Sequence, residues 1–272
     1  MTASGPSTPN CTPRTLLRAS ARQQDGVVTV ISVPFHLDEP MPPSTFPLVP
    51  DLTVAPDLPD GSPMDRMAVL YDQVAARVAE QVRPLVVSGD CTTSLGVVAG
   101  LQRAGVEPAI VWFDAHGDVH TPESSLSGYL GGMPLRQHVG GSDRTVPERI
   151  GLRPVREVDV VLVDARDLEP PEEEFLAASA IHRAGVGDVG DALPERPIYL
   201  HVDLDVIDPL GLPELLYPAP GGPDLAAVAD GVRAVLATGR VAAVGLACTW
   251  LRGGRPTDGI AGLAAELVEA LR

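Results

Sequence analysis

Residues 108–118 read Pro-Ala-Ile-Val-Trp-Phe-Asp-Ala-His-Gly-Asp, an apolar run followed by polar side chains at alternate positions, Asp114, His116 and Asp118. The apolar run predicts a buried strand. Residues two apart on an extended chain face the same way, so we expect these three side chains to converge. Carboxylates beside an imidazole are common metal ligands, and the stretch therefore predicts a metal site at the end of a strand.

A second stretch repeats this design. Residues 197–209 run from Pro197 through an apolar segment to two further carboxylates, Asp203 and Asp205. Four carboxylates gathered at one place would repel one another strongly unless cations neutralised them. Oxygen-rich ligation with one imidazole suits hard to borderline divalent metals, and Mn²⁺ above all. Both stretches together therefore predict a manganese site.

The composition indicates a folded chain with one domain. At 272 residues with 44% hydrophobic side chains, the chain can bury a sizeable core over residues 27–272. Residues 1–26 are rich in Ser, Thr, Pro and Arg, and we expect a mobile N-terminal arm there. The formal charge of −16 argues against a nucleic-acid partner, because phosphate neutralisation needs clustered Lys and Arg.

The cysteines and the apolar runs indicate a cellular location. Cys11, Cys91 and Cys248 lie far apart, and their odd count fits reduced thiols rather than a disulfide framework. No apolar run approaches the roughly 18 residues of a membrane span, and the N-terminus lacks a signal-peptide core. We therefore expect a cytoplasmic protein with no membrane partner.

Strand and helix patterns alternate along the chain. We expect strands at 27–33, 84–87, 108–114, 158–164, 198–204 and 241–247, and helices at 64–82, 92–104, 171–180, 224–238 and 260–271. Such alternation predicts an α/β fold with a mostly parallel sheet covered on both faces. Long irregular segments cover 34–63 and 117–134. In parallel sheets ligands bind beyond the carboxyl ends of the strands, where Cys91, Asp114, Asp164 and Asp203 should lie.

Three blocks carry a resemblance to a known family. They are 88–92 (SGDCT), 114–134 (DAHGDVHTPESSLSGYLGGMP) and 201–209 (HVDLDVIDP). In order and spacing they resemble the arginase and agmatinase ureohydrolases, whose patterns are GGDHS, DAHxDxxTPxxxxSGNLHGMP and SxDxDxxDP. The resemblance covers roughly residues 84 to 225. It implies a three-layer α/β/α arginase-like fold and hydrolysis of guanidino groups with two Mn²⁺ ions.

The resemblance implies six metal ligands: Cys91, Asp114, His116, Asp118, Asp203 and Asp205. Asp114 and Asp203 would bridge the two metals, Cys91 and Asp118 would complete one site, and His116 and Asp205 would complete the other. Asp118 and Asp205 are also expected among the catalytic residues. A metal-bridging hydroxide would attack the guanidino carbon, since paired metal ions generate hydroxide near neutral pH.

The same resemblance points to substrate contacts. His120 and Ser127 fall where the family holds the α-carboxylate of an amino-acid substrate, and Glu169 falls where a carboxylate holds the α-amino group. An amino acid is therefore favoured over a simple amine such as agmatine. Alternatives remain open, since His120 and Ser127 could instead brace the loop. Glu169 begins an acidic run that is typical of a solvated helix start.

The chain departs from the family pattern at four positions. Cys91 replaces a metal-ligand His, and Gly131 replaces the catalytic His of the SGNLHG block. Tyr217 and Trp250 fall near positions that line the guanidino pocket, where each is either a pocket wall or an ordinary core aromatic. A thiolate adds negative charge and makes the cluster a weaker Lewis acid. Losing the imidazole removes a proton shuttle that is typically worth ~10²–10⁴-fold in rate.

These departures favour a less basic guanidine than arginine. An N-hydroxyguanidine enters neutral and carries its own exchangeable proton. It also needs no Glu to pair with a guanidinium, and Trp250 falls near the position where the family has that Glu. The combination is similar to the hydroxyarginine-hydrolysing members of the family that serve D-cycloserine biosynthesis and release L-ornithine and hydroxyurea. Two alternatives are another ureohydrolase, such as an arginase, agmatinase or guanidino-acid hydrolase, and a retired fold that binds metal without turnover. The sequence does not decide the oligomeric state: a monomer is plausible, because the chain stops soon after its last helix, and a homo-oligomer is the alternative.

Overall fold

The computed structural model describes residues 1, 28–42, 45–251 and 254–272. The arm expected over residues 1–26 lies outside these ranges apart from Met1, and so do Cys11 and the first residue of the strand predicted at 27–33. Within the described ranges, no helix is long and apolar enough to cross a membrane.

An eight-stranded sheet forms the centre of the molecule. Its strands, in spatial order, are β4 (Leu52–Thr53), β1 (Val30–Val33), β5 (Leu85–Ser88), β10 (Val241–Ala247), β9 (Ile198–Asp203), β6 (Ala109–Asp114), β7 (Val160–Asp164) and β8 (His182–Ala184). Every pairing in it is parallel. The predicted parallel sheet is confirmed, and its central strands are buried throughout, as parallel strands covered on both faces must be.

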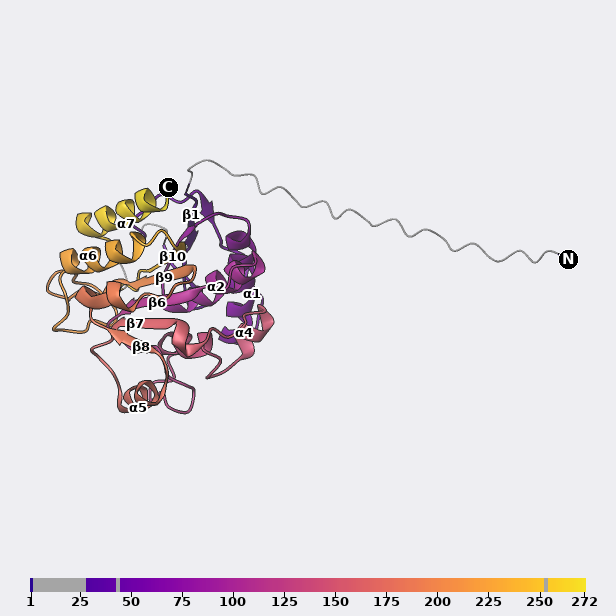
Figure 1. Ribbon diagram of the computed structural model, residues 1–272, viewed down its shortest axis with the longest axis horizontal. Helices are drawn as coiled ribbons and strands as arrows, with labels where there is room; N and C mark the ends of the chain where they lie inside the picture. Colours follow the sequence, from indigo (N-terminus) through magenta and orange to yellow (C-terminus); the bar gives the residue numbers. More distant parts are fainter. Residues whose placement is uncertain (2–27, 43–44, 252–253) are drawn as a thin grey trace.

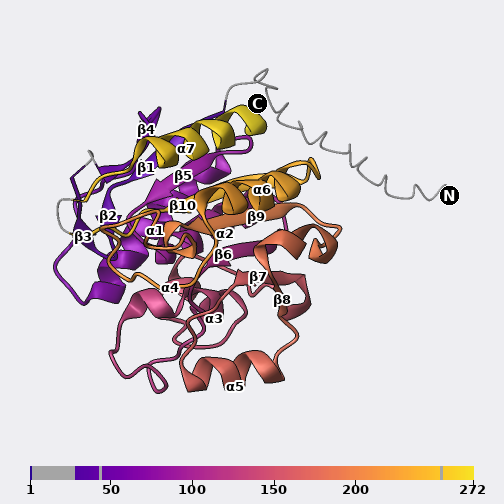
Figure 2. The ribbon, with the colours of Figure 1, turned by 90° about the vertical axis from the view of Figure 1, so that its left-hand side faces the viewer.

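Helices cover both faces of this sheet (Figures 1 and 2). The helices are α1 (Pro63–Ala79), α2 (Ser94–Arg103), α3 (Pro134–His138), α4 (Thr145–Arg149), α5 (Pro170–Ala178), α6 (Leu225–Leu236) and α7 (Asp258–Leu271). One buried apolar cluster joins α1 and α2 to one face, and a second joins α6 and α7 to the other. The three-layer α/β/α arrangement is therefore confirmed.

Helix α1 illustrates why the elements form where they do. Ser62 caps its N-terminus and exchanges hydrogen bonds with Asp65, a capping box that satisfies free backbone donors. The helix predicted at 64–82 would carry one apolar stripe, of which Met67, Leu70, Val74 and Val78 are buried in the core. The last apolar residue of that predicted helix, Val82, is 66% exposed. Its inclusion was wrong, because the helix ends at Ala79 and the periodicity no longer applies beyond it.

Short elements escaped the sequence patterns. The edge strands β4 and β8 and the ribbon of β2 (Phe35–His36) with β3 (Glu39–Pro40) have two or three residues each, too few to show a period. The helix predicted at 92–104 starts with a 3-10 turn at Cys91–Thr93, before α2. The other predicted strands and long helices match within a few residues, the uncertainty usual for element ends.

The candidate site residues lie at the carboxyl ends of the strands. Strands β6, β7 and β9 end on Asp114, Asp164 and Asp203, and β5 ends at Ser88, three residues before Cys91. Because β5, β10, β9 and β6 are adjacent in the sheet, the loops that follow them meet at one edge. The fold thus brings together residues more than a hundred positions apart.

Candidate functional site

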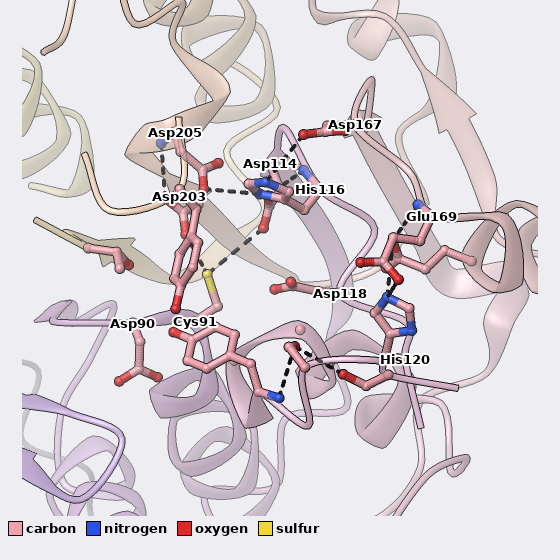
Figure 3. Close-up of a pocket in the computed structure, with 18 residues that line it drawn as sticks. Asp90, Cys91, Asp114, His116, Asp118, His120, Asp167, Glu169, Asp203 and Asp205 are labelled. Carbon is pink, nitrogen blue, oxygen red and sulfur yellow. Dashed lines mark hydrogen bonds and ion pairs between the residues drawn. The ribbon is translucent and has the colours of Figure 1, made fainter. Parts of the chain in front are cut away.

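A cavity of about 320 Å³ opens at this edge (Figure 3). Every site residue predicted from the sequence lines it: Cys91, Asp114, His116, Asp118, His120, Ser127, Glu169, Asp203 and Asp205. We call the six expected ligands the floor, namely Cys91, Asp114, His116, Asp118, Asp203 and Asp205. The structure therefore brings all of the predicted side chains to one hollow, from the ends of four strands and the segments that follow them.

Asp114 lies at the centre of the floor. Its Oδ2 accepts a hydrogen bond from Trp112 Nε1 at 3.0 Å, and its Oδ1 accepts one from the backbone N–H of His116 at 2.7 Å. Trp112 is fully buried and stacks on His201, with ring centroids 3.7 Å apart. The carboxylate is thus held in a fixed orientation by groups on its own strand and on the turn that follows.

His116 and Asp118 reach the floor by a route that the sequence did not predict. Strand β6 ends at Asp114, so strand alternation does not carry the next two side chains inward. Asp118 instead adopts φ 53°, the left-handed region that Asp tolerates better than most residues. The convergence is confirmed, but a turn and not an extended strand produces it.

Cys91 approaches from the opposite side, at the start of the 3-10 turn before α2. Its Sγ donates to Asp203 Oδ2 at 2.7 Å and lies 3.9 Å from Asp114 Oδ2. The preceding residue, Asp90, holds the turn by accepting from the backbone N–H of Thr92 at 2.7 Å. The thiol therefore points into the carboxylates (Figure 3).

The floor divides into two groups that share one member. Ligand atoms of Cys91, Asp114 and Asp118 lie within 4.8 Å of one another, and so do those of Asp114, His116 and Asp205. This is the division that the family resemblance implied for two metals. Asp203 belongs to neither group in this geometry, although its carboxylate contacts Cys91 Sγ and accepts from the backbone N–H of Asp205 at 2.9 Å.

The pKa values of most floor residues are shifted toward their protonated forms, as expected for crowded carboxylates that lack a neutralising cation. Burial and then the neighbouring carboxylates raise the pKa of Asp118 and Asp203 well above the usual range, and raise that of Asp205 to about 6. Burial alone would lower the pKa of His116, but hydrogen bonds to Asp114 and Asp205 raise it to about 12. Burial and the charge of Asp203 likewise raise the pKa of the Cys91 thiol. Bound protons thus neutralise the negative charge that metal cations would otherwise neutralise.

These residues fit divalent metal ions. Asp118 Oδ2 is buried without a hydrogen-bond partner among the described residues, which is costly unless another ligand takes it up. The donor set is rich in oxygen, with one imidazole and one sulfur, and suits borderline divalent metals. The floor therefore offers two groups of donors, each of which could hold a divalent ion.

The expected substrate contacts lie on the opposite side of the cavity. His120 is buried, and its Nε2 lies 3.5 Å from Glu169 Oε2 and 3.6 Å from Glu172 Oε2. Its Nδ1 is hydrogen-bonded to Ser124 Oγ at 3.0 Å, so part of its role is to hold the loop. Ser127 is exposed at the mouth and accepts from the backbone N–H of Tyr129.

Glu172 is a site residue that sequence reasoning missed. The acidic run at 169–174 predicted a solvated helix start, yet Glu172 is 4% exposed and lines the cavity. Its Oε1 accepts from the backbone N–H of Val119 and its Oε2 accepts from that of Glu169. Burial raises the pKa of this carboxyl. The Glu-Pro-Pro-Glu spacing of a capping box was the available signal.

Tyr217 and Trp250, two of the departures from the family pattern, lie in different surroundings. Tyr217 lines the cavity, whereas Trp250 is buried in the core and donates from Nε1 to the carbonyl of Thr45 at 2.9 Å. Its neighbour Thr249 lines the cavity instead. Trp250 therefore belongs to the core alternative and not to the pocket wall.

Gly131 sits beside an aromatic group. A Cβ at this position would lie 2.2 to 2.5 Å from three atoms of the Tyr129 ring and hydroxyl. Tyr129 packs between His36, with ring centroids 5.9 Å apart, and Tyr217, at 4.9 Å. We call these three residues the aromatic wall. It occupies the space that a side chain at position 131 would need.

Comparisons with known proteins agree with this geometry. The family model described as the arginase family matches residues 5–248. The arginase of Bacillus caldovelox is 32% identical over 173 residues, which cover 58% of this chain and 57% of that protein. The chain spans about half the length of the curated relatives that it matches.

Solved structures share the fold. The crystal structure of arginase from Bacillus cereus superposes with a TM-score of 0.75 at 22% identity, over 90% of this chain and 97% of that one. Formimidoylglutamase from Bacillus subtilis superposes with a TM-score of 0.67 at 15% identity, over 92% and 87%. Because the family model covers most of the sequence, this chain belongs to the arginase family.

Proposed function

We propose that this chain is a binuclear manganese amidinohydrolase that hydrolyses Nω-hydroxy-L-arginine to L-ornithine and hydroxyurea. Two divalent ions held by the floor would supply Lewis acidity, which lowers the pKa of water and makes a hydroxide nucleophile available near neutral pH. Asp114 lies in both ligand groups, which supports a bridging role for it. Asp203 would share that role, and its contact with Cys91 Sγ places it beside the first group.

The observation that carries the choice of substrate is the filled space beside Gly131. No imidazole can project from this position while Tyr129 occupies the space. The guanidinium of arginine stays protonated above pH ~12 and must be held and deprotonated for attack. The N-hydroxyl group withdraws electrons, so an N-hydroxyguanidine enters the cavity uncharged. The glycine at position 131 therefore disfavours hydrolysis of arginine but is compatible with hydrolysis of the hydroxylated substrate.

The remaining cavity supports an amino-acid substrate. His120 and Ser127 are proposed to hold the α-carboxylate at the mouth, and Glu169 to hold the α-amino group. Glu169 is half exposed and lies 3.5 Å from His120, so both can contact one polar end of a bound molecule. The buried Glu172 orients His120 from beneath. With the floor at the other end, the substrate would span the cavity.

A role for Cys91 as a metal ligand bears on the ionisation of its thiol and on the location of the protein. Metal binding would displace its proton, because a coordinated thiol ionises despite a raised pKa. Such a ligand must stay reduced, which favours a cytoplasmic location. We also propose that the protein takes part in antibiotic biosynthesis of the D-cycloserine type.

A single assay tests the function. The Mn²⁺-loaded protein is incubated separately with L-arginine, agmatine, N-formimidoyl-L-glutamate and Nω-hydroxy-L-arginine, and ornithine, putrescine or glutamate is measured. We expect turnover of the hydroxylated substrate with a kcat/KM at least about 10²-fold above that for arginine, because arginine enters as a cation that must lose a proton before attack. Comparable turnover of arginine contradicts the substrate assignment. No turnover of any substrate favours a retired, metal-binding fold.

A further inference from the structure

The aromatic wall contains a hydrogen-bonded Tyr–His pair that the family pattern does not explain. Tyr129 Oη and His36 Nε2 lie 3.1 Å apart, and their rings are stacked. Tyr129 lines the cavity, and its hydroxyl oxygen is 2.5 Å from the place where a Cβ at position 131 would stand. A group able to exchange protons thus stands beside the position at which the family carries its catalytic His.

The tautomer of His36 follows from its second contact. Its Nδ1 lies 3.3 Å from the carbonyl oxygen of Gly89, which can only accept a hydrogen bond. Nδ1 therefore carries the proton, and Nε2 is the acceptor for the Tyr129 hydroxyl in the neutral ring. Burial and then the charge of Asp90 raise the pKa of Tyr129, so its hydroxyl stays protonated at rest.

The backbone holds His36 firmly against this edge of the sheet. The β2–β3 ribbon is tied to the turn after β5, because Leu37 N–H donates to Asp90 Oδ2 at 2.5 Å and Gly89 N–H donates to Phe35 O at 3.1 Å. A Cβ at Gly89 would lie 2.3 Å from the Phe35 carbonyl oxygen, so only glycine permits this approach. The pair is thus positioned by rigid contacts.

We propose that Tyr129 is the proton-transfer group of this site, and that His36 is the positioning residue that accepts and returns its proton. The proposal rests on the amidinohydrolase function proposed above. Tyr129 Oη takes a proton from the attacking water while its own proton passes to His36 Nε2, which forms an imidazolium. The imidazolium then returns its proton to Oη, and the hydroxyl protonates the leaving nitrogen as that nitrogen takes the C–N bonding electrons. One proton moves from water to nitrogen, and both residues are restored.

This relay accounts for two departures in one block. The family pattern quoted above has Asn and His where this chain has Tyr129 and Gly131. The ring of Tyr129 lies where a Cβ at position 131 would stand, so a side chain at 131 would force the ring to move. The exchange replaces an imidazole from position 131 by a phenol that is backed by an imidazole from a distant strand.

The test uses the full-length, Mn²⁺-loaded protein and its turnover of Nω-hydroxy-L-arginine. Tyr129→Phe removes only the hydroxyl and should lower kcat by about 10²-fold or more with little change in KM, the range for general acid–base groups. His36→Gln keeps a hydrogen-bond acceptor but cannot carry the proton, so it should lower kcat by about 10-fold or more. Because both act in one relay, the double variant should be no worse than Tyr129→Phe alone. His182→Gln, a matched change at an exposed histidine on β8, should leave kcat unchanged.

A second set tests the exclusion between positions 129 and 131. Gly131→His alone should lower the melting temperature, because the imidazole meets the Tyr129 ring. The double variant Y129N/G131H should recover both stability and activity relative to Gly131→His.

Two results would overturn the relay while leaving the proposed function intact. One is a wild-type-like kcat in Tyr129→Phe, and the other is a double variant in which the effects of Tyr129→Phe and His36→Gln on kcat simply multiply. A wild-type protein that turns over no guanidino or amidino substrate would overturn both.

Discussion

The floor and the aromatic wall of the cavity differ in how they are built. The floor comes from the ends of β5, β6 and β9 and the turns directly after them, and it keeps every ligand position of the family pattern, with Cys91 as the one change of residue type. The aromatic wall comes from loops and the small β2–β3 ribbon, and its residue Tyr129 departs from that pattern. The sheet therefore fixes the metal chemistry, whereas loop residues are free to alter the substrate.

Removing the shared ligand should have the largest effect. Asp114→Asn leaves an amide in both ligand groups, so we expect loss of both metals and of all turnover. Metal content by mass spectrometry and activity on Nω-hydroxy-L-arginine measure this. Asp72→Asn is the matched control, because Asp72 is half exposed in a surface ion pair with Arg103, a type worth little. Full metal content in Asp114→Asn would remove that residue from the centre of the floor.

A smaller effect should come from the group that orients Asp114. Trp112→Phe deletes the Nε1 donor and keeps an aromatic ring, and the loss of such an orienting bond typically weakens metal binding by about 10–100-fold. Titration with Mn²⁺ gives the affinity. The wall substitution Tyr129→Phe should leave the affinity unchanged, which separates the two regions. Equal loss of affinity in both variants would contradict the division into floor and wall.

The smallest expected effect is a pH trend in stability without metal. The folded state raises the pKa of Asp205 from 3.8 to about 6, so this group contributes stability that is fully present below its unfolded pKa and lost as pH rises through about 6. His116, raised from 6.5 to about 12, acts in the same direction at higher pH. The lowered pKa of Asp114 acts oppositely, but only below its ordinary value of 3.8. Burial lowers the pKa of His138 and His201 from 6.5 to about 3, so these two groups also act oppositely, and only below about pH 6.5. The raised pKa values of Asp118 and Asp203 act in the same direction as that of Asp205.

The melting temperature of the metal-free protein should therefore fall between about pH 5 and pH 7, because the folded state loses its extra proton there. Addition of Mn²⁺ should reverse the trend, since protons compete with metal for the same atoms. Differential scanning calorimetry with and without chelator measures both curves. Parallel curves would show that the buried carboxylates do not control stability in this range.

The same division explains what could be predicted from the sequence. The floor was predictable because each ligand follows a long apolar strand, and parallel strands bring their carboxyl ends together. The turn that places Asp118 was not, since its positive φ has no period to reveal it. His36 lies on a two-residue strand, more than ninety positions from Tyr129, so no local pattern joins them. Glu172 was hidden in an acidic run that usually faces solvent.

The central claim is that the floor binds two metal ions and that Cys91 is a ligand of one. Anomalous diffraction at the manganese edge from Mn²⁺-loaded crystals tests it directly. We predict two peaks between Asp114 and Asp203, one of them also bound by Cys91 Sγ and Asp118 and the other by His116 and Asp205. A single peak, or two peaks with the Cys91 thiol turned away from both, would contradict it.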